Sequence, residues 1–292
     1  METNETLDPE YLRARIDDAL AEDGAANDST VGLLELGDVA VRAEITVKSD
    51  GVVAGLDVAR AVFLRVDDDI EFQSIATDGD GVGRDDLLAG LGGRAGSILA
   101  AERVALNFLQ SLSGVATMTA RFVEAVAGTG VRILDTRKTT PGLRRLQRYA
   151  VRVGGGYNHR FNLSDMVLIK ENHIRAAGGA KFVTEMLARS APDTTIEIEV
   201  DTLDLLQTIL GSPVDRIMLD NLTPDEVRGA VDMIGKFRSQ SPDFNPTIEV
   251  SGGVNLENIA GYAVEGVSEI SIGQLTHSVR ALDISLEVMG GR

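Results

Sequence analysis

The sequence predicts an α/β protein, built as an incomplete parallel α/β barrel of about six strands with an N-terminal α+β sandwich domain. Two observations predict this class. Six short apolar runs in the second half of the chain each end in a polar motif, and helix-compatible stretches separate most of them. The runs are also too apolar for strands with one solvent-facing side, and therefore suit parallel strands covered by helices.

The polar residues follow the C-terminal ends of all six runs, which is where a closed α/β barrel collects its active site. The runs occupy residues 131–138, 166–172, 195–201, 216–221, 247–254 and 269–274. A doubly wound open sheet is the alternative. Such a sheet binds its ligand at one switch point and would not need polar residues at the ends of all six strands. Six strands fall short of the usual eight, so we expect an open side that packs against the N-terminal domain or a second subunit.

The N-terminal part mixes one helical pattern with strand-like pieces. Residues 10–20 predict an amphipathic helix, and residues 39–49, 51–63 and 70–82 read as β-rich segments between Gly and Asp turns. Residues 98–127 have helical periodicity, with a break expected at Ser113–Gly114. We therefore expect a sandwich domain over 1–112 and the barrel over 113–274, with 275–292 a candidate to pack back on the first domain.

Composition limits the function classes. The 292 residues carry a net charge of −17 and no cysteine, which excludes disulfides and thiolate chemistry. A strongly acidic chain disfavours nucleic acid as a partner, and no run approaches the roughly 18 apolar residues of a membrane span. We expect a cytoplasmic protein. Because only five of the 28 basic residues are lysines, the surface resembles that of a salt-adapted protein from a halophilic archaeon, although an acidic mesophile protein is the alternative.

One segment reverses the charge trend. Residues 132–175 contain ten basic side chains and three acidic ones, which is costly unless an anion neutralises them. A solvated basic helix would explain the arginines at 144, 145, 148 and 152, whose spacing fits one helix. It does not explain Arg137, Lys138 or Lys170, which lie at the ends of apolar runs. The segment therefore predicts an anion-binding site.

The strand ends offer two kinds of chemistry. The first two runs and the loop between them provide cationic and imidazole donors for carboxylate or phosphate, namely Arg137, Lys138, His159, Arg160 and Lys170. The third and fourth runs end in Glu199 and Asp220, whose oxygens suit Mg²⁺.

The last two runs end in glycine-rich motifs. Ser251, Gly252 and Gly253 follow the fifth run, and adjacent glycines let backbone N–H groups approach a phosphate closely. A helix expected just after Val254 would add its positive end. Gly273 ends the sixth run, before Gln274 and His277. Together the strand ends predict a cavity that binds a phosphorylated ligand with Mg²⁺ and a second, anionic ligand against a basic wall.

Several strings resemble the motifs of quinolinate phosphoribosyltransferases. They are LDTRKTTPGLRRLQRYAVRVGGGYNHRFNLSDMVLIKENHI, EIEVD, LDN, EVSGGV and SIGQLTHS, with ERVALNFLQSLSG at 102–114, and the resemblance runs from about residue 20 to the C-terminus. It implies a homodimer, or a higher oligomer built from dimers, in which each active site faces the partner's N-terminal domain. The implied reaction converts quinolinate and phosphoribosyl pyrophosphate to nicotinate mononucleotide, pyrophosphate and CO₂, in NAD biosynthesis.

The resemblance also implies residue roles. Quinolinate would contact Thr136, Arg137, His159, Arg160, Lys170 and, from the partner subunit, the residue equivalent to Arg103. Phosphoribosyl pyrophosphate would contact Lys138, Glu199, Asp220, Ser251, Gly252, Gly253, Ile272, Gly273, Gln274 and His277. The residues implied in catalysis are Lys138, Lys170, Glu199 and Asp220, and the last two would hold Mg²⁺. His277 could instead cap backbone groups, and His173 suits a supporting role.

Three other interpretations remain open on sequence alone. A related enzyme could use nicotinate or another carboxylated base, although five candidate donors favour a dicarboxylate. Lys170 could be the Schiff-base lysine of an aldolase, which would leave the arginines and the SGG motif unexplained. A non-enzymatic binding module would have no evident use for a pair of carboxylates beside a basic pocket.

Overall fold

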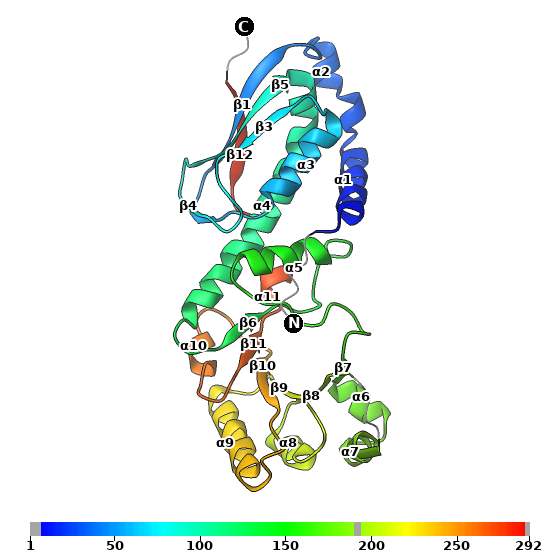
Figure 1. The fold of residues 1–292 in the computed structure, drawn as a ribbon, viewed down its shortest axis with the longest axis vertical. Coiled ribbons are helices and arrows are strands. Elements are labelled where there is room, and N and C mark those ends of the chain that lie inside the picture. The colour runs from blue at the N-terminus through cyan, green and yellow to red at the C-terminus, as the bar shows by residue number, and fades with distance from the viewer. Residues whose placement is uncertain (1–6, 190–193, 290–292) are drawn as a thin grey trace. The chain divides into compact units, whose positions relative to one another are not determined.

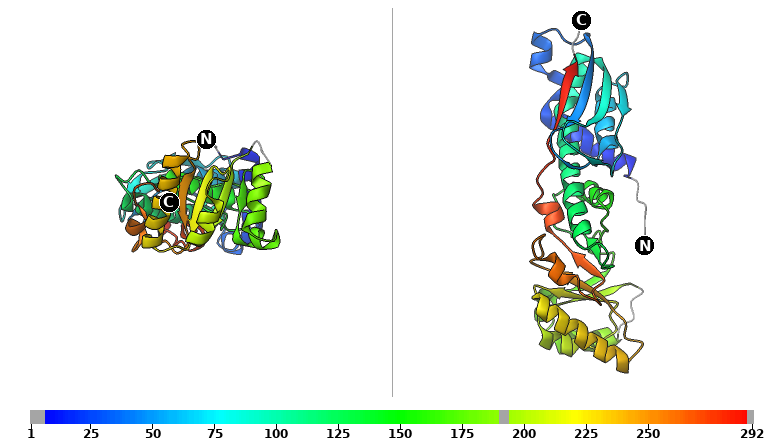
Figure 2. Two further views of the ribbon diagram at one scale, coloured as in Figure 1. Left: turned by 90° about the horizontal axis from the view of Figure 1, so that it is seen from below. Right: turned by 90° about the vertical axis from the view of Figure 1, so that its left-hand side faces the viewer.

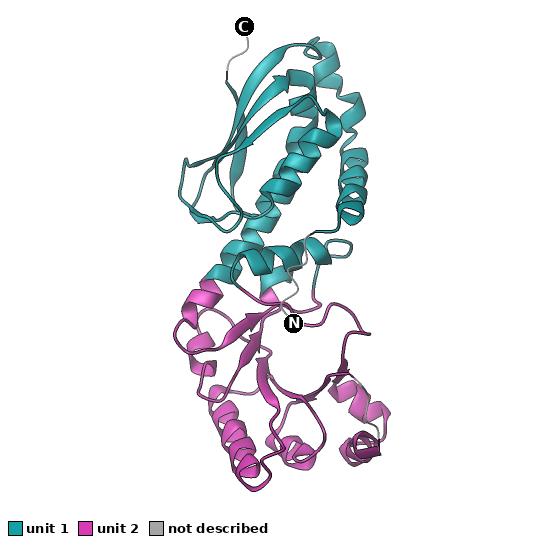
Figure 3. Ribbon diagram, viewed as in Figure 1, with its two compact units in different colours: residues 1–120, 139–155, 275–292 teal, residues 121–138, 156–274 magenta. Residues whose placement is uncertain are grey.

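The computed structural model describes residues 7–189 and 194–289. The chain forms two compact units, which Figure 3 shows in separate colours. Unit 1 comprises residues 1–120, 139–155 and 275–292, and unit 2 comprises residues 121–138 and 156–274. The boundary expected at 112/113 falls inside a single long helix, Ala95–Ala125, and the division into domains at that position stays a prediction.

Unit 1 has an antiparallel four-stranded sheet with helices beside it (Figure 1). The strand order is β12 (Ile284–Met289), β1 (Ala40–Val47), β5 (Leu87–Arg94) and β3 (Glu71–Ser74). The long helices are α1 (Pro9–Asp23), α3 (Leu56–Val66) and α4 (Ala95–Ala125). Alternate residues of β1 are buried and share one core cluster with Phe63 and Leu106 from the helices. The C-terminal strand β12 therefore completes the sheet of unit 1.

Shorter elements complete unit 1. They are η1 (Ala25–Asn27), α2 (Ser29–Leu33), the paired strands β2 (Gly51–Val52) and β4 (Gly81–Val82), and α5 (Arg144–Val153). The predicted helix over 10–20 is confirmed by α1, and the helical spacing of the arginines from 144 to 152 by α5.

The strand-like interpretation of 51–63 is wrong beyond β2, because α3 begins at Leu56. Gly55 adopts a left-handed conformation with φ of 98°, which turns the chain into the helix. The Asp78 carboxylate accepts hydrogen bonds from the backbone N–H groups of Gly55 at 2.7 Å and Leu56 at 2.9 Å. A residue more than 20 positions away thus caps the start of α3.

The expected break at Ser113–Gly114 is also wrong, because α4 continues through it. Ser113 Oγ accepts a hydrogen bond from the Ala54 N–H at 3.0 Å, so its hydroxyl serves a neighbouring segment. A Cβ atom at Gly114 would lie 2.5 Å from the Arg280 carbonyl oxygen. This glycine permits close packing rather than ending the helix.

Unit 2 contains the predicted parallel sheet, with all six strands confirmed at the expected runs. They are β6 (Arg132–Leu134), β7 (Val167–Ile169), β8 (Ile196–Val200), β9 (Arg216–Asp220), β10 (Thr247–Ser251) and β11 (Glu269–Ser271). The strand order is β6-β11-β10-β9-β8-β7, so β6 and β7, which are consecutive in the chain, lie at opposite edges of the sheet. This open edge between consecutive strands confirms an incomplete barrel.

Helices connect these strands and follow the outer side of the curved sheet (Figures 1 and 2). They are α6 (Glu171–Ala176), α7 (Ala180–Arg189), α8 (Leu203–Ile209), α9 (Pro224–Gln240) and α10 (Ile259–Tyr262), and α11 (Gln274–His277) follows β11. Among the described residues, no helix is both long enough and apolar enough to cross a membrane.

Candidate active site

A cavity of about 480 Å³ lies at the C-terminal ends of the strands of unit 2. It brings together most of the residues that the sequence singled out: Thr136, Arg137, Lys138, His159, Arg160, Lys170, Glu199, Asp220, Ser251, Gly252 and Gly253. The remaining lining residues are Leu168, Met218, Asn221 and Ser271. In parallel α/β sheets this end of the strands is where ligands bind, so the cavity is the candidate active site.

Five sequence-predicted site residues are not among those that line this cavity. Ile272 is buried directly after β11, and Gly273 and Gln274 follow it. Arg103 and His277 belong to unit 1; Arg103 is about half exposed beside Glu102, and His277 is exposed, with Nδ1 2.6 Å from the Ser278 hydroxyl. Their roles stay predictions.

Four cationic side chains line the cavity, which is fewer than the basic segment suggested. Arg160 donates from Nη1 to the Met166 carbonyl at 3.2 Å. Burial lowers the pKa of Arg160, and the charge of nearby Arg137 lowers it further, so the two guanidinium groups are close enough to repel each other. The arginines from 144 to 152 lie on α5 in unit 1 instead. An anionic ligand between Arg137 and Arg160 would relieve their repulsion.

Lys170 is placed by two neighbours. Its backbone N–H donates to Nδ1 of His173 at 2.9 Å, in the capping box at the start of α6. Its ammonium group forms an ion pair with Glu199. His173 therefore supports the segment that carries Lys170, as its predicted supporting role requires.

The acidic side of the cavity is formed by Glu199 at β8 and Asp220 at β9. Burial raises the pKa of Asp220 and the charge of Glu199 raises it further, although Lys170, Ser251 and Lys138 act in the opposite direction. Two mutually repelling, partly buried carboxylates beside a polar cavity fit a hard divalent cation such as Mg²⁺.

The SGG motif forms a tight turn at the end of β10. Gly252 and Gly253 have φ values of 85° and 66°, and a Cβ atom on Gly252 would lie 2.3 Å from Asn221 Oδ1. The Asn221 N–H in turn donates to the Ser251 carbonyl at 2.9 Å. Glycine is therefore required here both by conformation and by close approach.

The helix expected just after Val254 is wrong, because α10 begins only at Ile259. The intervening residues form a turn in which the Asn255 N–H donates to Asn258 Oδ1 at 2.8 Å, and Asn258 Nδ2 donates to the Gly253 carbonyl at 3.0 Å. These asparagine contacts hold the turn that a helix was expected to fill. Any phosphate site at Gly252–Gly253 therefore relies on backbone N–H groups rather than on an adjacent helix end.

Sequence reasoning missed a second layer of charged side chains beneath the cavity: Glu197, Arg216, Glu249 and Glu269. Side chains alternate between the two faces of a strand, so Glu197 shares the inner face with Glu199, one step deeper. Glu197 and Glu249 are fully buried at 0% exposure. The signal was present as a two-residue period in EIEVD and EVSGG, hidden in runs taken as apolar throughout.

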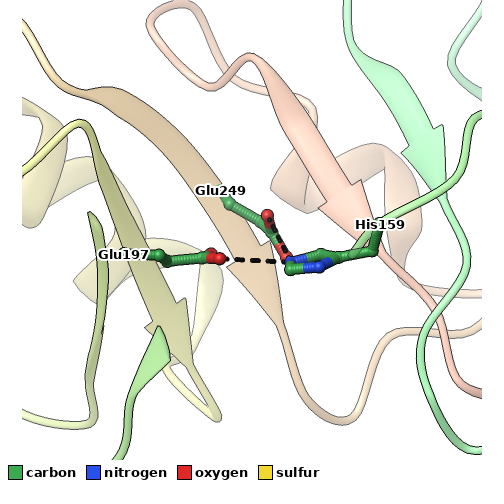
Figure 4. Close-up of side chains that lie close together, drawn as sticks. All are labelled: His159, Glu197 and Glu249. Carbon is green, nitrogen blue, oxygen red and sulfur yellow. Dashed lines mark ion pairs between the residues drawn. The ribbon is translucent and has the colours of Figure 1, made fainter. Parts of the chain in front are cut away.

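This second layer is linked by ion pairs. Arg216 Nη2 lies 2.6 Å from Glu249 Oε2 and also pairs with Glu269, which pairs in turn with Arg132. His159 connects the layer to the cavity, with Nε2 3.2 Å from Glu197 Oε2 and 3.4 Å from Glu249 Oε2 (Figure 4). Burial of His159 opposes a charge on the ring, but the two carboxylates outweigh burial and raise its pKa.

A curved parallel sheet with this cavity defines a barrel-type enzyme site for anionic ligands. The family model described as the quinolinate phosphoribosyl transferase C-terminal domain matches residues 115–287, and the model of the N-terminal domain matches residues 28–113. The chain therefore belongs to the quinolinate phosphoribosyltransferase family.

Individual relatives agree with the family models. A probable nicotinate-nucleotide pyrophosphorylase (carboxylating) of Bacillus subtilis is 42% identical over 253 residues, which cover 86% of this chain and 85% of the relative. The chloroplastic nicotinate-nucleotide pyrophosphorylase (carboxylating) of Arabidopsis thaliana is 41% identical over 96% of this chain and 84% of its own. The solved nicotinate-nucleotide pyrophosphorylase from Francisella tularensis is 35% identical, with a TM-score of 0.89 over 99% of this chain and 100% of its own.

Proposed function

We propose that this chain is a quinolinate phosphoribosyltransferase, also named nicotinate-nucleotide pyrophosphorylase (carboxylating), of NAD biosynthesis. It converts quinolinate and phosphoribosyl pyrophosphate to nicotinate mononucleotide, pyrophosphate and CO₂. The observation that carries this proposal is that four cations, two carboxylates and the SGG turn line one cavity in a member of this family. Both substrates are anions, and this lining has complementary groups for each.

The cationic wall of the cavity consists of Arg137, Lys138, Arg160 and Lys170, and it orients quinolinate. Arg137 and Arg160 can each hold a carboxylate with two parallel hydrogen bonds, and Lys170 adds a point charge. The pyridine nitrogen then attacks the anomeric carbon of the ribose as pyrophosphate leaves. Charge moves from the sugar to the leaving group, so Lys138 and the N–H groups of the SGG turn stabilise the departing phosphates.

Decarboxylation follows from the same binding mode. Once alkylated, the ring nitrogen is positive and stabilises the electron pair that remains on the ring carbon when the adjacent carboxylate leaves as CO₂. This carbon then takes up a proton from solvent, which gives nicotinate mononucleotide. The cationic wall therefore has to hold two carboxylates while contacting one of them more weakly as its charge disappears.

Glu199 and Asp220 would hold Mg²⁺, because their carboxylates repel each other and face the cavity. When bound, the ion supplies charge neutralisation for the pyrophosphate group. Asp220 also accepts a hydrogen bond from Ser251, which lowers its pKa and favours the charged carboxylate.

We also propose a homodimer in which Arg103 reaches the partner's cavity, which the exposed position of Arg103 on α4 and the family resemblance support. We propose a cytoplasmic location, with which the lack of cysteine is compatible. The net charge of −17 supports a third proposal, that the surface is salt-adapted.

The direct test is turnover of quinolinate with phosphoribosyl pyrophosphate and Mg²⁺, followed by release of labelled CO₂ across a range of potassium chloride concentrations. Nicotinate serves as the comparison substrate, because it enters the same transfer without decarboxylation. Preference for nicotinate would refute the dicarboxylate assignment, and a Schiff base trapped on Lys170 by borohydride would place the chain in a different reaction class.

Substitution of the cationic wall tests the site itself. Lys138→Ala and Arg160→Ala should each lower kcat/KM by about 10² or more, the loss expected when one donor to a charged transition state is removed. Circular dichroism should show both variants folded, because strand-end donors serve the cavity rather than the core. Near-normal turnover in both variants would remove this assignment.

A further inference from the structure

Asn221 lines the cavity of unit 2, although it was not among the residues singled out in the sequence. It directly follows β9 and adopts a left-handed conformation with φ of 58°. Within the described residues, only Glu35 and Asp85 share a positive φ among residues other than glycine. Such a conformation typically costs about 1–3 kcal/mol and is concentrated at functional sites, and asparagine is one of the side chains that adopts it most readily.

The left-handed conformation places two consecutive residues at the same cavity. Side chains of consecutive residues in an extended strand point to opposite faces of the sheet. However, β9 ends at Asp220, and both Asp220 and Asn221 line the cavity. The change of backbone conformation at Asn221 lets its carboxamide reach the carboxylate of the residue before it.

The carboxamide holds Asp220 without cancelling its charge. Asn221 Nδ2 donates to Asp220 Oδ2 at 2.6 Å, and the Ser251 side chain donates to the same carboxylate group. Both donors are neutral, whereas the nearby carboxylate of Glu199 is paired with the ammonium group of Lys170. A carboxylate has about four acceptor positions, so Asp220 can accept both bonds and still bind a cation or a hydroxyl group.

The other end of the same carboxamide lies against the SGG turn. A Cβ atom on Gly252 would lie 2.3 Å from Asn221 Oδ1, so this approach requires glycine at position 252. The Asn221 N–H donates to the Ser251 carbonyl at 2.9 Å, and Asp220 is aligned with Ser251 in the parallel pairing of β9 and β10. Asn221 therefore contacts both the Asp220 carboxylate and the turn at Gly252, the two groups that the proposed function assigns to phosphoribosyl pyrophosphate.

We propose that Asn221 is a positioning residue for phosphoribosyl pyrophosphate, whose carboxamide fixes the Asp220 carboxylate relative to the Gly252 turn. The proposal rests on the proposed function of the cavity, because it takes phosphoribosyl pyrophosphate as the ligand of these groups. Arg137 and Arg160, which are proposed to bind quinolinate, lie on the segment between β6 and β7 instead. Loss of the Asn221 carboxamide should therefore weaken the binding of one substrate far more than that of the other.

Two substitutions separate the carboxamide from the backbone conformation. Asn221→Gly keeps the left-handed conformation accessible and removes the carboxamide. Asn221→Asp keeps the size of the side chain but replaces the N–H donor with a carboxylate oxygen beside Asp220. The matched control is Asp85→Gly, which removes an exposed side chain at another left-handed position, in unit 1.

The assay compares the affinities of the full-length protein for its two substrates in the presence of Mg²⁺. Calorimetry measures each substrate alone, without turnover, and KM values at a saturating concentration of the other substrate give the same comparison during catalysis. Both Asn221 variants should weaken the binding of phosphoribosyl pyrophosphate about 10-fold or more, as is typical of residues that orient a metal-binding group, and leave the affinity for quinolinate nearly unchanged. Asp85→Gly should change neither affinity.

Several results would overturn the proposal. Affinity for phosphoribosyl pyrophosphate equal to that of the parent in Asn221→Gly would show that the carboxamide is not needed, and the same result in Asn221→Asp would show that its N–H donor is not. An equal loss of affinity for both substrates would indicate a general structural role. A parent protein that neither binds nor turns over quinolinate would instead overturn the proposed function.

Discussion

Replacement of Arg216 by methionine should destabilise unit 2 strongly. Arg216 is the cation shared by Glu249 and Glu269, and the three side chains are 18%, 0% and 4% exposed. Removing the guanidinium leaves two buried carboxylates without their common partner, and breaking a buried pair in this way costs about 3–5 kcal/mol. For a protein of this size each kcal/mol lowers the melting temperature by roughly 2–4 °C, so the expected decrease is on the order of 10 °C.

The assay is thermal unfolding followed by calorimetry and circular dichroism at fixed pH and salt. Arg228→Met is the matched control, because Arg228 forms an ion pair with Asp225 that is largely exposed to solvent. Exposed pairs contribute about 0–1 kcal/mol, so the control should melt close to the parent.

A compensated variant completes the test. Replacing Arg216 by Met together with Glu249→Gln and Glu269→Gln removes the charges on both sides, and such replacements of buried ion pairs are often close to neutral. The triple variant should therefore be more stable than Arg216→Met alone. A cost below about 1 kcal/mol for the single variant, or no recovery in the triple variant, would refute the view that this network is a compensated set of buried charges.

Three further predictions concern other parts of the molecule. Arg94, whose Nη2 lies 2.8 Å from Asp67 Oδ1, and Ser97 both lower the pKa of the Asp67 carboxyl group. The stability that Asp67 contributes should therefore be complete above the pKa of the unfolded state and be lost as the pH falls, so the difference in melting temperature between the parent and Asp67→Asn should narrow below about pH 4. Gly114→Ala should destabilise by about 1–3 kcal/mol through overpacking, whereas Gly235→Ala in α9, where a Cβ meets open space, should stabilise by up to about 1 kcal/mol, as chemical denaturation would reveal. Mixing the inactive Arg103→Ala and Lys138→Ala subunits should restore some activity in verified heterodimers, and no recovery would place the arginine in its own chain's site.

The six barrel strands and most cavity residues were predictable from sequence because both depend on local order along the chain. Each strand is a short apolar run, and each cavity residue follows the run directly, so parallel alignment alone brings residues such as Lys138, Glu199 and Ser251 to one edge. The aligned register of Asp220 with Ser251, and of Ser251 with Ser271, shows how strand pairing gathers residues that are distant in sequence.

The errors occurred where a distant segment decides the local structure. Helix α3 begins at Leu56 because Asp78 caps it, and α4 continues past Gly114 because the chain near Arg280 packs against it. Neither partner can be inferred from the residues next to the helix. Buried charges were missed for a similar reason. A carboxylate such as Glu197 is costly to bury without a partner, and its partner, His159, is distant in the sequence.

The two charge layers explain how an acidic protein can gather cations around one cavity. The cavity lining is net positive, with four cationic side chains against Glu199 and Asp220, whereas the layer beneath it has three buried carboxylates and the two arginines that pair with them. The same carboxylates raise the pKa of His159, and with a charged ring the deeper layer holds three cations against three carboxylates. Such a compensated layer adds no net repulsion to the cations above it before any ligand binds. The cavity can therefore be preorganised for anions, because the protein's own carboxylates lie on the core side and leave the opposite side of each cation for substrate.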